Sequence, residues 1–332
     1  MAKDRGVANY LDKPAAWYAS QEGRRIAANV LSWQSDLGGW PKNVDTANAP
    51  CAGRDRQKDL KPTFDNGATT DELRFLARAY SATGDKEDQA AVERGVDYIL
   101  RAQYPTGGWP HSYPPDQSYH RRITFNDDAM VRLMYLLRDI YSDPRFGSLD
   151  PGRRQGARAA FNQGIACILK CQIKVGGKLT AWCAQHDEKD YSPRVGRSYE
   201  LPSISGAESV GVVRFLMSLE RPTPEVVRAV EGAVAWFDAV KLTGIRVVVV
   251  PDENSPTGTD KRVVADPSAP PLWARFYEIH TNRPIFCDRD GVARYQLDQI
   301  GYERRNAYQW LSDWPRALLE KEFPAWKVPL KP

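Results

Sequence analysis

The sequence has no run of 18 apolar residues, so nothing in it predicts a membrane-spanning helix. Its 332 residues include only five cysteines, which are too few and too scattered for a disulfide scaffold: Cys51, Cys167, Cys171, Cys183 and Cys287. Packed free thiols are the simplest interpretation, with one disulfide left open.

The start, MAKDRGVANYLDK, lacks the apolar core of a signal peptide. The protein is therefore either cytoplasmic or a secreted mature form without its signal.

Several catalytic signatures are also missing. There is no P-loop, no dinucleotide G-x-G-x-x-G after a strand, no H-E-x-x-H and no G-x-S-x-G. The Lys and Arg residues form no run of the kind found in nucleic-acid-binding arms, and the net charge is a mild +4. That balance suits a polyanionic partner and does not select between nucleic acid and an acidic polysaccharide.

Aromatic residues are plentiful. They make up 11% of the chain, with ten Trp and fifteen Tyr, in a composition that is otherwise ordinary for a globular protein. Flat amphipathic rings fill cores, and they also line carbohydrate sites, where a ring suits the face of a sugar. Composition alone leaves both uses open.

One motif occurs three times. Gln34, Gln103 and Gln172 are spaced by 69 residues, and each is followed four residues later by Gly-Gly. The first two copies continue as Gly-Gly-Trp-Pro, whereas the third reads QIKVGGKL and has Lys178 where the others have Trp. Glycines that accept positive φ are expected to end a helix at each copy.

Apolar spacing predicts a helix on each side of every glycine turn. The preceding helices are expected at 22–34, 87–103 and 152–172, and the following ones at 66–82, 127–141 and 206–220, with another at 224–240. Ser205 and Glu208 have the spacing of a capping box at the third start. Three helical hairpins at about 22–240 would bury their apolar stripes against one another in a ring or barrel.

After residue 240 the sequence pattern changes from helical spacing to strand-like segments. Strands are expected at 245–250, 273–279 and 284–289, followed by a largely helical stretch at 294–311. No clean linker interrupts the chain, so the sequence predicts a single domain over 1–332, with short strands and a terminal helix at about 241–315. Its fold class is mainly α.

Acidic residues begin the second helix of the first two hairpins, in TFDNGATTDE and TFNDDAM. Asp and Asn are preferred helix N-caps, and a single copy would be read as a cap. Two copies at matching points of a repeat would place carboxylates at the same end of neighbouring helices. Such oxygens could hold calcium, or could form the acid/base pair of a glycosidase.

Arginine is the second signal. Arg197 precedes the third helix start, and the region 262–305 contains Arg275, Arg283, Arg289, Arg294, Arg304 and Arg305. Arginine pairs bidentately with carboxylates, either those of a ligand or those of neighbouring Asp and Glu. The segment 180–193 adds Trp182 and His186. His186 could be a base or a ligand, or a structural hydrogen-bonding residue.

At these residues the sequence resembles the family 10 polysaccharide lyases, which are bacterial pectate lyases. The matching segments run in order through about residues 30–291: SWQSDLGGWPKN, TFDNGATTDEL, AQYPTGGWPHSYP, ITFNDDAM, WCAQHD, RSYELPSISGAES, WARFYEI and FCDRDG. The resemblance implies an (α/α)3 barrel or partial α/α toroid, secretion, and calcium-dependent β-elimination of α-1,4-linked polygalacturonate. The missing signal peptide is the one departure. We expect a monomer that binds neither nucleic acid nor membrane.

The resemblance also implies roles for particular residues. The calcium carboxylates map to Asp65 and Asp127, with Asp128 as a competing choice for the second. Arg289 maps to the base, with Arg294 and Lys178 as rivals. Substrate contacts are expected from a further set: Arg197, Arg275, Lys178, Trp182, His186 and Asn66.

Three other functions stay open at this point. A helical terpene cyclase also carries Q-x-x-x-G-x-W repeats, but the D-x-D-D motif of such enzymes is absent here. A non-catalytic binding protein for acidic polysaccharides would use the same arginines as a grip for uronates. A glycoside hydrolase on a similar helical toroid would release reducing ends without an unsaturated product.

Overall fold

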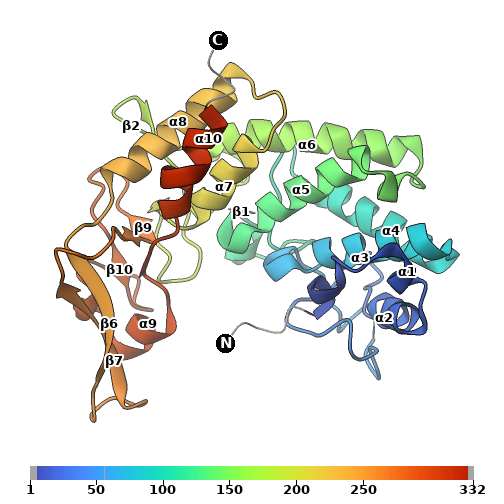
Figure 1. Ribbon diagram of the computed structural model, residues 1–332, viewed down its shortest axis with the longest axis horizontal. Coiled ribbons are helices and arrows are strands. Elements are labelled where there is room, and N and C mark those ends of the chain that lie inside the picture. The colour runs from blue at the N-terminus through green and yellow to red at the C-terminus, as the bar shows by residue number, and fades with distance from the viewer. Residues whose placement is uncertain (1–5, 56, 328–332) are drawn as a thin grey trace. The chain divides into compact units, whose positions relative to one another are not determined.

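The computed structural model describes residues 6–55 and 57–327. The chain forms two compact units, and the boundary between them falls between Cys167 and Ile168. Each unit is helical for much of its length and carries short strands (Figure 1). The prediction of a single catalytic domain over the whole chain stays a prediction.

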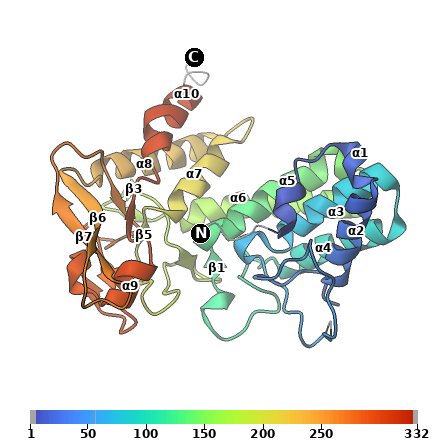
Figure 2. The same ribbon diagram turned by 60° about the horizontal axis from the view of Figure 1, so that its bottom comes forward.

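Unit 1 is built around helix α3 (Thr70–Thr83). This helix packs against its neighbours in the chain, α1 (Ala15–Tyr18), α2 (Gln21–Ser32), α4 (Lys86–Ala102) and α5 (Ala129–Ser142). Leu73, Phe75 and Leu76 line its core-facing side and have no exposed surface. Figure 2 shows these helices gathered together in the blue-to-green part of the ribbon. Helix α6 (Pro151–Cys171) follows and contains the boundary.

Unit 2 combines helices with paired strands. Helices α7 (Glu208–Met217) and α8 (Pro224–Ala239) pack together, and α9 (Tyr302–Ala307) and α10 (Phe323–Lys327) follow later. The longest strands, β6 (Ile245–Pro251) and β7 (Thr259–Ala265), form an antiparallel hairpin. The other pairs are two residues long: β2 (Lys174–Val175) with β3 (Lys178–Leu179), β5 (Ile204–Ser205) with β9 (Phe276–Tyr277), β8 (Trp273–Ala274) with β12 (Leu311–Ser312), and β10 (Phe286–Cys287) with β11 (Ala293–Arg294).

The predicted mainly helical class is confirmed, and every helix expected in the hairpins is present within about four residues. The (α/α)3 arrangement of those hairpins stays a prediction. None of the five cysteines forms a disulfide. Within the described ranges, no helix has both the length and the apolarity that crossing a membrane requires.

The helix expected at 294–311 is wrong. Within this segment the structure has only the short helix α9 and a single 3₁₀ turn, Leu297–Gln299, because Arg294 pairs with Phe286 and Leu311 pairs with Ala274 in short strands at the two ends. Pairing with residues distant in the sequence has overridden the local helical pattern.

The repeated glutamine is a structural tie. The side-chain amide of Gln34 donates to the Gly38 carbonyl at 2.8 Å and to the Ala91 carbonyl at 2.9 Å, 57 residues further along. Gln103 donates in the same way to the carbonyls of Gly107 and Ala160. Each tie fastens the end of one helix to the first helix of the next hairpin.

The tryptophan that follows each turn is the second half of this device. The indole nitrogens of Trp40 and Trp109 donate to carbonyls ten residues earlier, those of Val30 and Ile99. Both rings are fully buried. In the motif Q-x-x-x-G-G-W, two side chains therefore hold the end of the helix through hydrogen bonds: the glutamine amide and the tryptophan indole.

The third copy of the motif differs from the alignment that the sequence suggested. Gln172 donates to the carbonyls of Thr180 and Ala229, and the indole of Trp182 donates to the Ile168 carbonyl. Trp182 is thus the third tryptophan of the series, moved along the chain by an inserted hairpin, β2–β3. Gly176 and Gly177 lie in the turn of that hairpin and do not replace Gly38 and Gly39.

Replacing Gln34 with Leu should lower the free energy of unfolding by about 2–4 kcal/mol, because it removes the buried hydrogen bonds that the Gln34 side chain makes with two carbonyls and with the Arg94 guanidinium. Chemical denaturation measures this change. Gln155→Leu is the matched control, since Gln155 is an exposed glutamine of α6, and it should change stability by less than about 0.5 kcal/mol. Equal effects would contradict the tie.

Candidate functional site

The two acidic segments form short turns and do not cap the helices that follow. Asp65–Gly67 (η2) and Asn126–Asp128 (η4) are single 3₁₀ turns, and α3 and α5 begin after them, at Thr70 and Ala129. Neither helix has a side-chain hydrogen bond at its N-cap. The two turns contact each other within unit 1. The simple cap interpretation is therefore wrong, and the repeat brings two acidic turns together as expected.

The repeat aligns TFDN with TFND, so Asp65 corresponds to Asn126. Both residues are about 4% exposed, and the Oδ1 atom of each is buried without a hydrogen-bond partner. The preceding residues, Phe64 and Phe125, have no exposed surface and anchor the turns in the core. Buried polar atoms are nearly always paired, so two unpaired oxygens at matching positions call for an explanation.

Asn66 and Asp127 occupy the next position of the alignment. Both are exposed and have left-handed backbone conformations, with φ of 55° and 51°. Asp128, the competing choice, also has positive φ and is half-buried. The Asn126 amide donates to Asp127 Oδ2 at 2.6 Å. Asp127 thus stands at the surface of the turn, beside the buried Asn126.

Two further residues reach Asp65, and they come from the repeated motif. Lys42 Nζ donates to Asp65 Oδ2, and His111 Nδ1 lies 3.9 Å from the same oxygen. Lys42 follows Trp40-Pro41, and His111 stands at the same point after Trp109-Pro110. Sequence reasoning missed both, although their equal position after the two Trp-Pro pairs was a signal that could have found them.

These oxygens fit a hard cation such as calcium. Asp65 Oδ1 and Asn126 Oδ1 are uncommitted oxygens in contacting turns, and calcium prefers carboxylate and amide oxygen ligands. Among the described residues, no group of three or more His, Cys, Asp or Glu side chains is arranged to hold a metal ion. An ion here would therefore need water or an anionic ligand to complete its coordination.

Unit 2 contains a cluster of arginines around two tyrosines. The rings of Tyr199 and Tyr308 lie edge to face, with centroids 5.2 Å apart. Four guanidinium groups lie within 6 Å of one or both ring centroids, and together these six residues form the arginine–tyrosine cluster: Tyr199, Tyr308, Arg197, Arg275, Arg289 and Arg304. Cations are attracted to aromatic ring faces, so the two rings help to hold four like charges together.

Arg197 is the most firmly held of these arginines. Its Nε donates to Glu200 Oε1 at 2.8 Å and its backbone N–H donates to Oε2, while the Tyr308 hydroxyl donates to Oε1 at 2.7 Å. Burial alone would raise the pKa of Glu200, but the hydrogen bonds and charge of Arg197 outweigh it, so this pKa lies below its ordinary value. Burial works against the charge of Arg197 too, but Glu200 raises its pKa above the ordinary value.

Arg275 has 13% of its side chain exposed and pairs with Glu208. Glu208 begins α7 and meets Ser205 Oγ through its carboxylate, while its backbone N–H donates to the same Oγ. The predicted capping box is therefore only half formed, because the carboxylate binds Arg275 and the serine hydroxyl and does not return to the backbone N–H of Ser205.

Arg289 and Arg294 are the two sequence candidates for the base. Arg289 has 64% of its side chain exposed and donates to Glu303 over 3.2–3.3 Å. Arg294 pairs with Asp290 at 2.7 Å, outside the cluster. The sequence showed Arg304 only as one of several arginines. Only 9% of its side chain is exposed, its guanidinium lies 4.5 Å from the centroid of the Tyr199 ring, and it pairs with Glu303, as Arg289 does.

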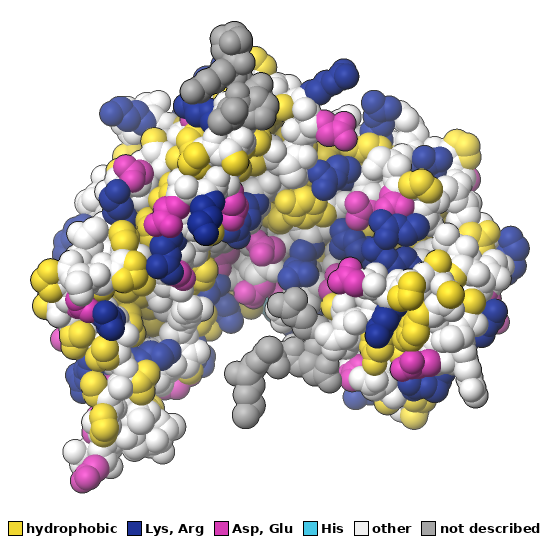
Figure 3. Space-filling view, viewed as in Figure 1, with side chains coloured by type: hydrophobic (Ala, Val, Ile, Leu, Met, Phe, Trp, Pro, Cys, Tyr) yellow, Lys and Arg dark blue, Asp and Glu magenta, His cyan; other side chains and the backbone are white. Residues whose placement is uncertain are grey.

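Mixed charge is general on this protein. Figure 3 shows Lys and Arg side chains interspersed with Asp and Glu over the visible face. Every arginine of the cluster likewise has a carboxylate partner: Glu200, Glu208 or Glu303. The expectation that some arginines pair with neighbouring acids is confirmed, and a substrate carboxylate would have to share or displace these partners.

Two of the predicted substrate contacts are corrected. Trp182 has no exposed surface, and its indole is committed to the Ile168 carbonyl. His186 is equally buried: Nε2 accepts from the Cys183 backbone N–H at 3.0 Å, and Nδ1 lies 2.8 Å from the Tyr191 carbonyl oxygen. Neither side chain can reach a polysaccharide, so both are structural. Lys178 is exposed on β3, and its role stays a prediction.

Residues 34–319 match the family model described as pectic acid lyase. This match covers most of the chain. The protein belongs to the pectic acid lyase family. It is accordingly a polysaccharide lyase that acts on pectic polysaccharide, and the predicted resemblance to family 10 is confirmed.

Solved structures agree with this assignment. The chain is 35% identical to the family 10 polysaccharide lyase from Cellvibrio cellulosa, covering 100% of this chain and 99% of that one with a TM-score of 0.80. A mutant of that lyase in complex with trigalacturonic acid matches over 97% of both chains, with 35% identity and a TM-score of 0.79.

One short match has a different character. The chain is 51% identical over 37 residues to protostadienol synthase A from Neosartorya fischeri. Those residues are 11% of this lyase and 5% of the synthase, so the chain spans a small fraction of that relative's length. The match is too short to assign a function.

The buried His186 predicts a pH dependence of stability. Burial lowers its pKa from 6.5 to about 4, so the unfolded chain takes up a proton at a higher pH than the folded protein. The stability that His186 contributes is thus present above pH 6.5 and is lost as pH falls toward 4, by a total on the order of 3 kcal/mol. NMR titration measures this pKa directly, with the signal assigned by its loss in His186→Gln. A midpoint near 6.5 would contradict the buried position.

Proposed function

We propose that this pectic acid lyase cleaves α-1,4-linked polygalacturonate by calcium-assisted β-elimination. The observation that carries the proposal is the pair of contacting acidic turns, in which Asp65 and Asn126 each hold a buried oxygen without a partner. Asp65 and Asp127 would supply the carboxylates that hold the ion, and the Asn126 amide oxygen would add a neutral ligand. Asn66, exposed on the same turn as Asp65, would contact the sugar.

The reaction requires removal of a very weakly acidic proton. The C5 proton of galacturonate lies next to a carboxylate, and its removal builds negative charge on that group. A bound calcium ion would neutralise this charge as a Lewis acid. The electron pair left at C5 forms the C4–C5 double bond and expels O4 with the leaving chain, so no water needs to attack.

The arginine–tyrosine cluster would provide the protein's own part. Arg197 and Arg275 are oriented by Glu200 and Glu208, and they would bind substrate carboxylates through their remaining N–H groups. Fixed donors of this kind stabilise developing charge without reorganising during the reaction. Lys178 would supply a further exposed cation.

Arg289 is our proposed base. It is the most exposed arginine of the cluster, and its contacts with Glu303 are long, so a substrate can reach its guanidinium. Accepting the C5 proton requires a transiently neutral guanidinium, which the neighbouring cations Arg197 and Arg304 would favour once Glu303 is displaced. Arg294 and Lys178 are the alternatives.

The same family membership supports proposals for the fold, the partner and the location. We propose that the three hairpins form an (α/α)3 barrel or partial toroid, and that the enzyme acts as a secreted monomer on extracellular polygalacturonate. The relative from Cellvibrio cellulosa that is complexed with trigalacturonic acid supports a polygalacturonate substrate.

Replacing Asp65 with Asn should lower kcat/KM on polygalacturonate by roughly 100-fold and weaken calcium binding, because a carboxylate ligand becomes a neutral amide. The ultraviolet absorbance of the unsaturated product measures activity, and calorimetry measures calcium affinity. Asp238→Asn, an exposed aspartate paired with Lys241, is the control and should leave both unchanged. Activity that survives a chelator would sink the calcium proposal.

Replacing Arg289 with Ala should reduce kcat by about 1000-fold if its guanidinium accepts the proton, because general base catalysis contributes about 10²- to 10⁴-fold. Arg294→Ala should retain kcat within about threefold. The same ultraviolet assay at saturating substrate compares the two variants. Near-full turnover by Arg289→Ala, or a larger loss in Arg294→Ala, would show that the base is assigned to the wrong residue.

A further inference from the structure

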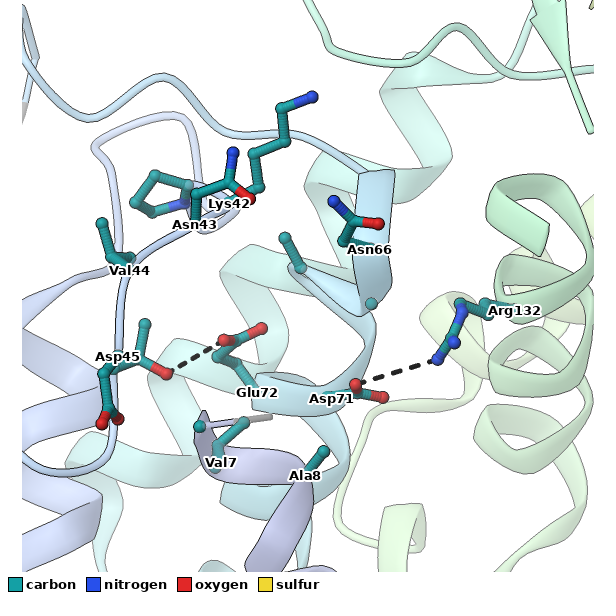
Figure 4. A pocket seen from close by; sticks show the side chains of 15 residues that line it. Val7, Ala8, Lys42, Asn43, Val44, Asp45, Asn66, Asp71, Glu72 and Arg132 are labelled. Carbon is teal, nitrogen blue, oxygen red and sulfur yellow. Dashed lines mark hydrogen bonds and ion pairs between the residues drawn. The ribbon is translucent and has the colours of Figure 1, made fainter. Parts of the chain in front are cut away.

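A cavity of about 700 Å³ opens beside the acidic turn η2, within unit 1. Its volume is within the range of small-ligand sites. Figure 4 shows Asp71 and Glu72 lining it from α3, Arg132 approaching from α5, and Asn66 of the acidic turn on another side. Lys42 and Asp45 are the other charged residues of its lining.

Glu72 is the first group in this cavity with unused bonding capacity. It is 6% exposed, Oε1 accepts from the Thr46 hydroxyl at 3.0 Å, and Oε2 is buried without a partner. Burial, together with the charge of Asp71, raises the pKa of Glu72 to about 8. The carboxyl is therefore protonated at neutral pH, so it does not repel an anion and its O–H group can donate to a sugar hydroxyl.

Arg132 is the second such group. Its Nη1 lies 3.9 Å from Asp71 Oδ2, which is too long for a hydrogen bond, and its Nε is buried without a partner. About 40% of the side chain is exposed. A guanidinium that is held this loosely still has the planar fork that binds a carboxylate with two hydrogen bonds.

The other charged groups of the lining are already committed. The Asp71 carboxylate lies 3.9 Å from the guanidinium groups of both Arg74 and Arg132, which balance its charge. Lys42 pairs with Asp65, and Asp45 accepts from the backbone N–H groups of Ala47 and Asn48. The bonding capacity left over therefore comes from one cation and one neutral carboxyl. A ligand that matches both carries a carboxylate and hydroxyl groups.

We propose that this cavity is a binding subsite for a uronate residue of the polysaccharide, with Arg132 on the sugar carboxylate and Glu72 on a hydroxyl. The inference rests on the proposed function and deepens it, since Asn66 joins the cavity to the turn that carries Asp65. The subsite grips a part of the chain other than the bond that breaks, so it contributes to substrate affinity and leaves the chemical step alone.

The experiment measures the binding of trigalacturonate by calorimetry in calcium-free buffer with chelator, which removes any contribution from a bound calcium ion. Arg132→Met should weaken binding about tenfold, as expected for the loss of a charge-assisted hydrogen bond. Arg138→Met is the matched control, because Arg138 belongs to the same helix, stacks on Tyr135 and does not line the cavity. It should leave the affinity unchanged.

Glu72 has its own pair of variants. Glu72→Gln keeps a neutral hydrogen-bonding side chain of the same shape and should bind trigalacturonate within about threefold of wild type, whereas Glu72→Met should lose about fivefold in affinity.

A neutral α-1,4-linked trigalactoside should bind wild type and Arg132→Met equally, because it has no carboxylate. Thermal unfolding of each variant shows that the fold is intact, and Arg132→Gln replaces Arg132→Met if that variant does not fold.

Two results would overturn the subsite: no trigalacturonate binding by the wild type, or equal affinities for Arg132→Met and Arg138→Met. Kinetics separate this failure from failure of the proposed function. With polygalacturonate and calcium, Arg132→Met should raise KM about tenfold and keep kcat within twofold. A wild type that binds trigalacturonate but forms no unsaturated product would refute the lyase mechanism and leave the subsite standing.

Discussion

The amide of a buried glutamine is the interaction on which the rest of this structure depends. At Gln34, Gln103 and Gln172 it binds a carbonyl of the following turn and a second carbonyl 57 residues after the glutamine, so each hairpin is fastened to the next helix. Hydrogen bonds to buried carbonyls are costly to leave unmade, which makes the tie specific for this side chain. Because the ties recur at a fixed interval in the sequence, the segment that follows each helix lies at an equivalent position in its own hairpin.

These equivalent positions explain the site in unit 1. The turn containing Asp65 lies against the turn containing Asn126, and Lys42 and His111 both lie near the Asp65 carboxylate. Such a concentration of unpaired oxygen and charge costs stability, which the ties and the buried aromatic anchors offset. In unit 2 the same balance holds for four arginines, which lie together because tyrosine faces and glutamate partners share their charge.

Periodicity predicted the hairpin helices because their apolar faces are local features of the sequence. It failed at 294–311, where strand pairing with residues 273–274 and 286–287 decides the structure. The acidic turns and the arginines were found by residue type, and Trp182 and His186 were misassigned because burial is not visible in a motif. The tyrosines of the cluster could not be found, since only the tertiary fold brings Tyr308 to Tyr199 and Glu200.

The central claim is that the paired acidic turns hold calcium. The most direct measurement is a crystal structure of the wild-type enzyme with calcium and trigalacturonate, using anomalous diffraction to locate the ion. We expect an anomalous peak in contact with Asp65 Oδ1 and with the turn of Asp127, with Lys42 moved away from Asp65. A peak elsewhere, or no peak at saturating calcium while Lys42 stays paired with Asp65, would contradict it.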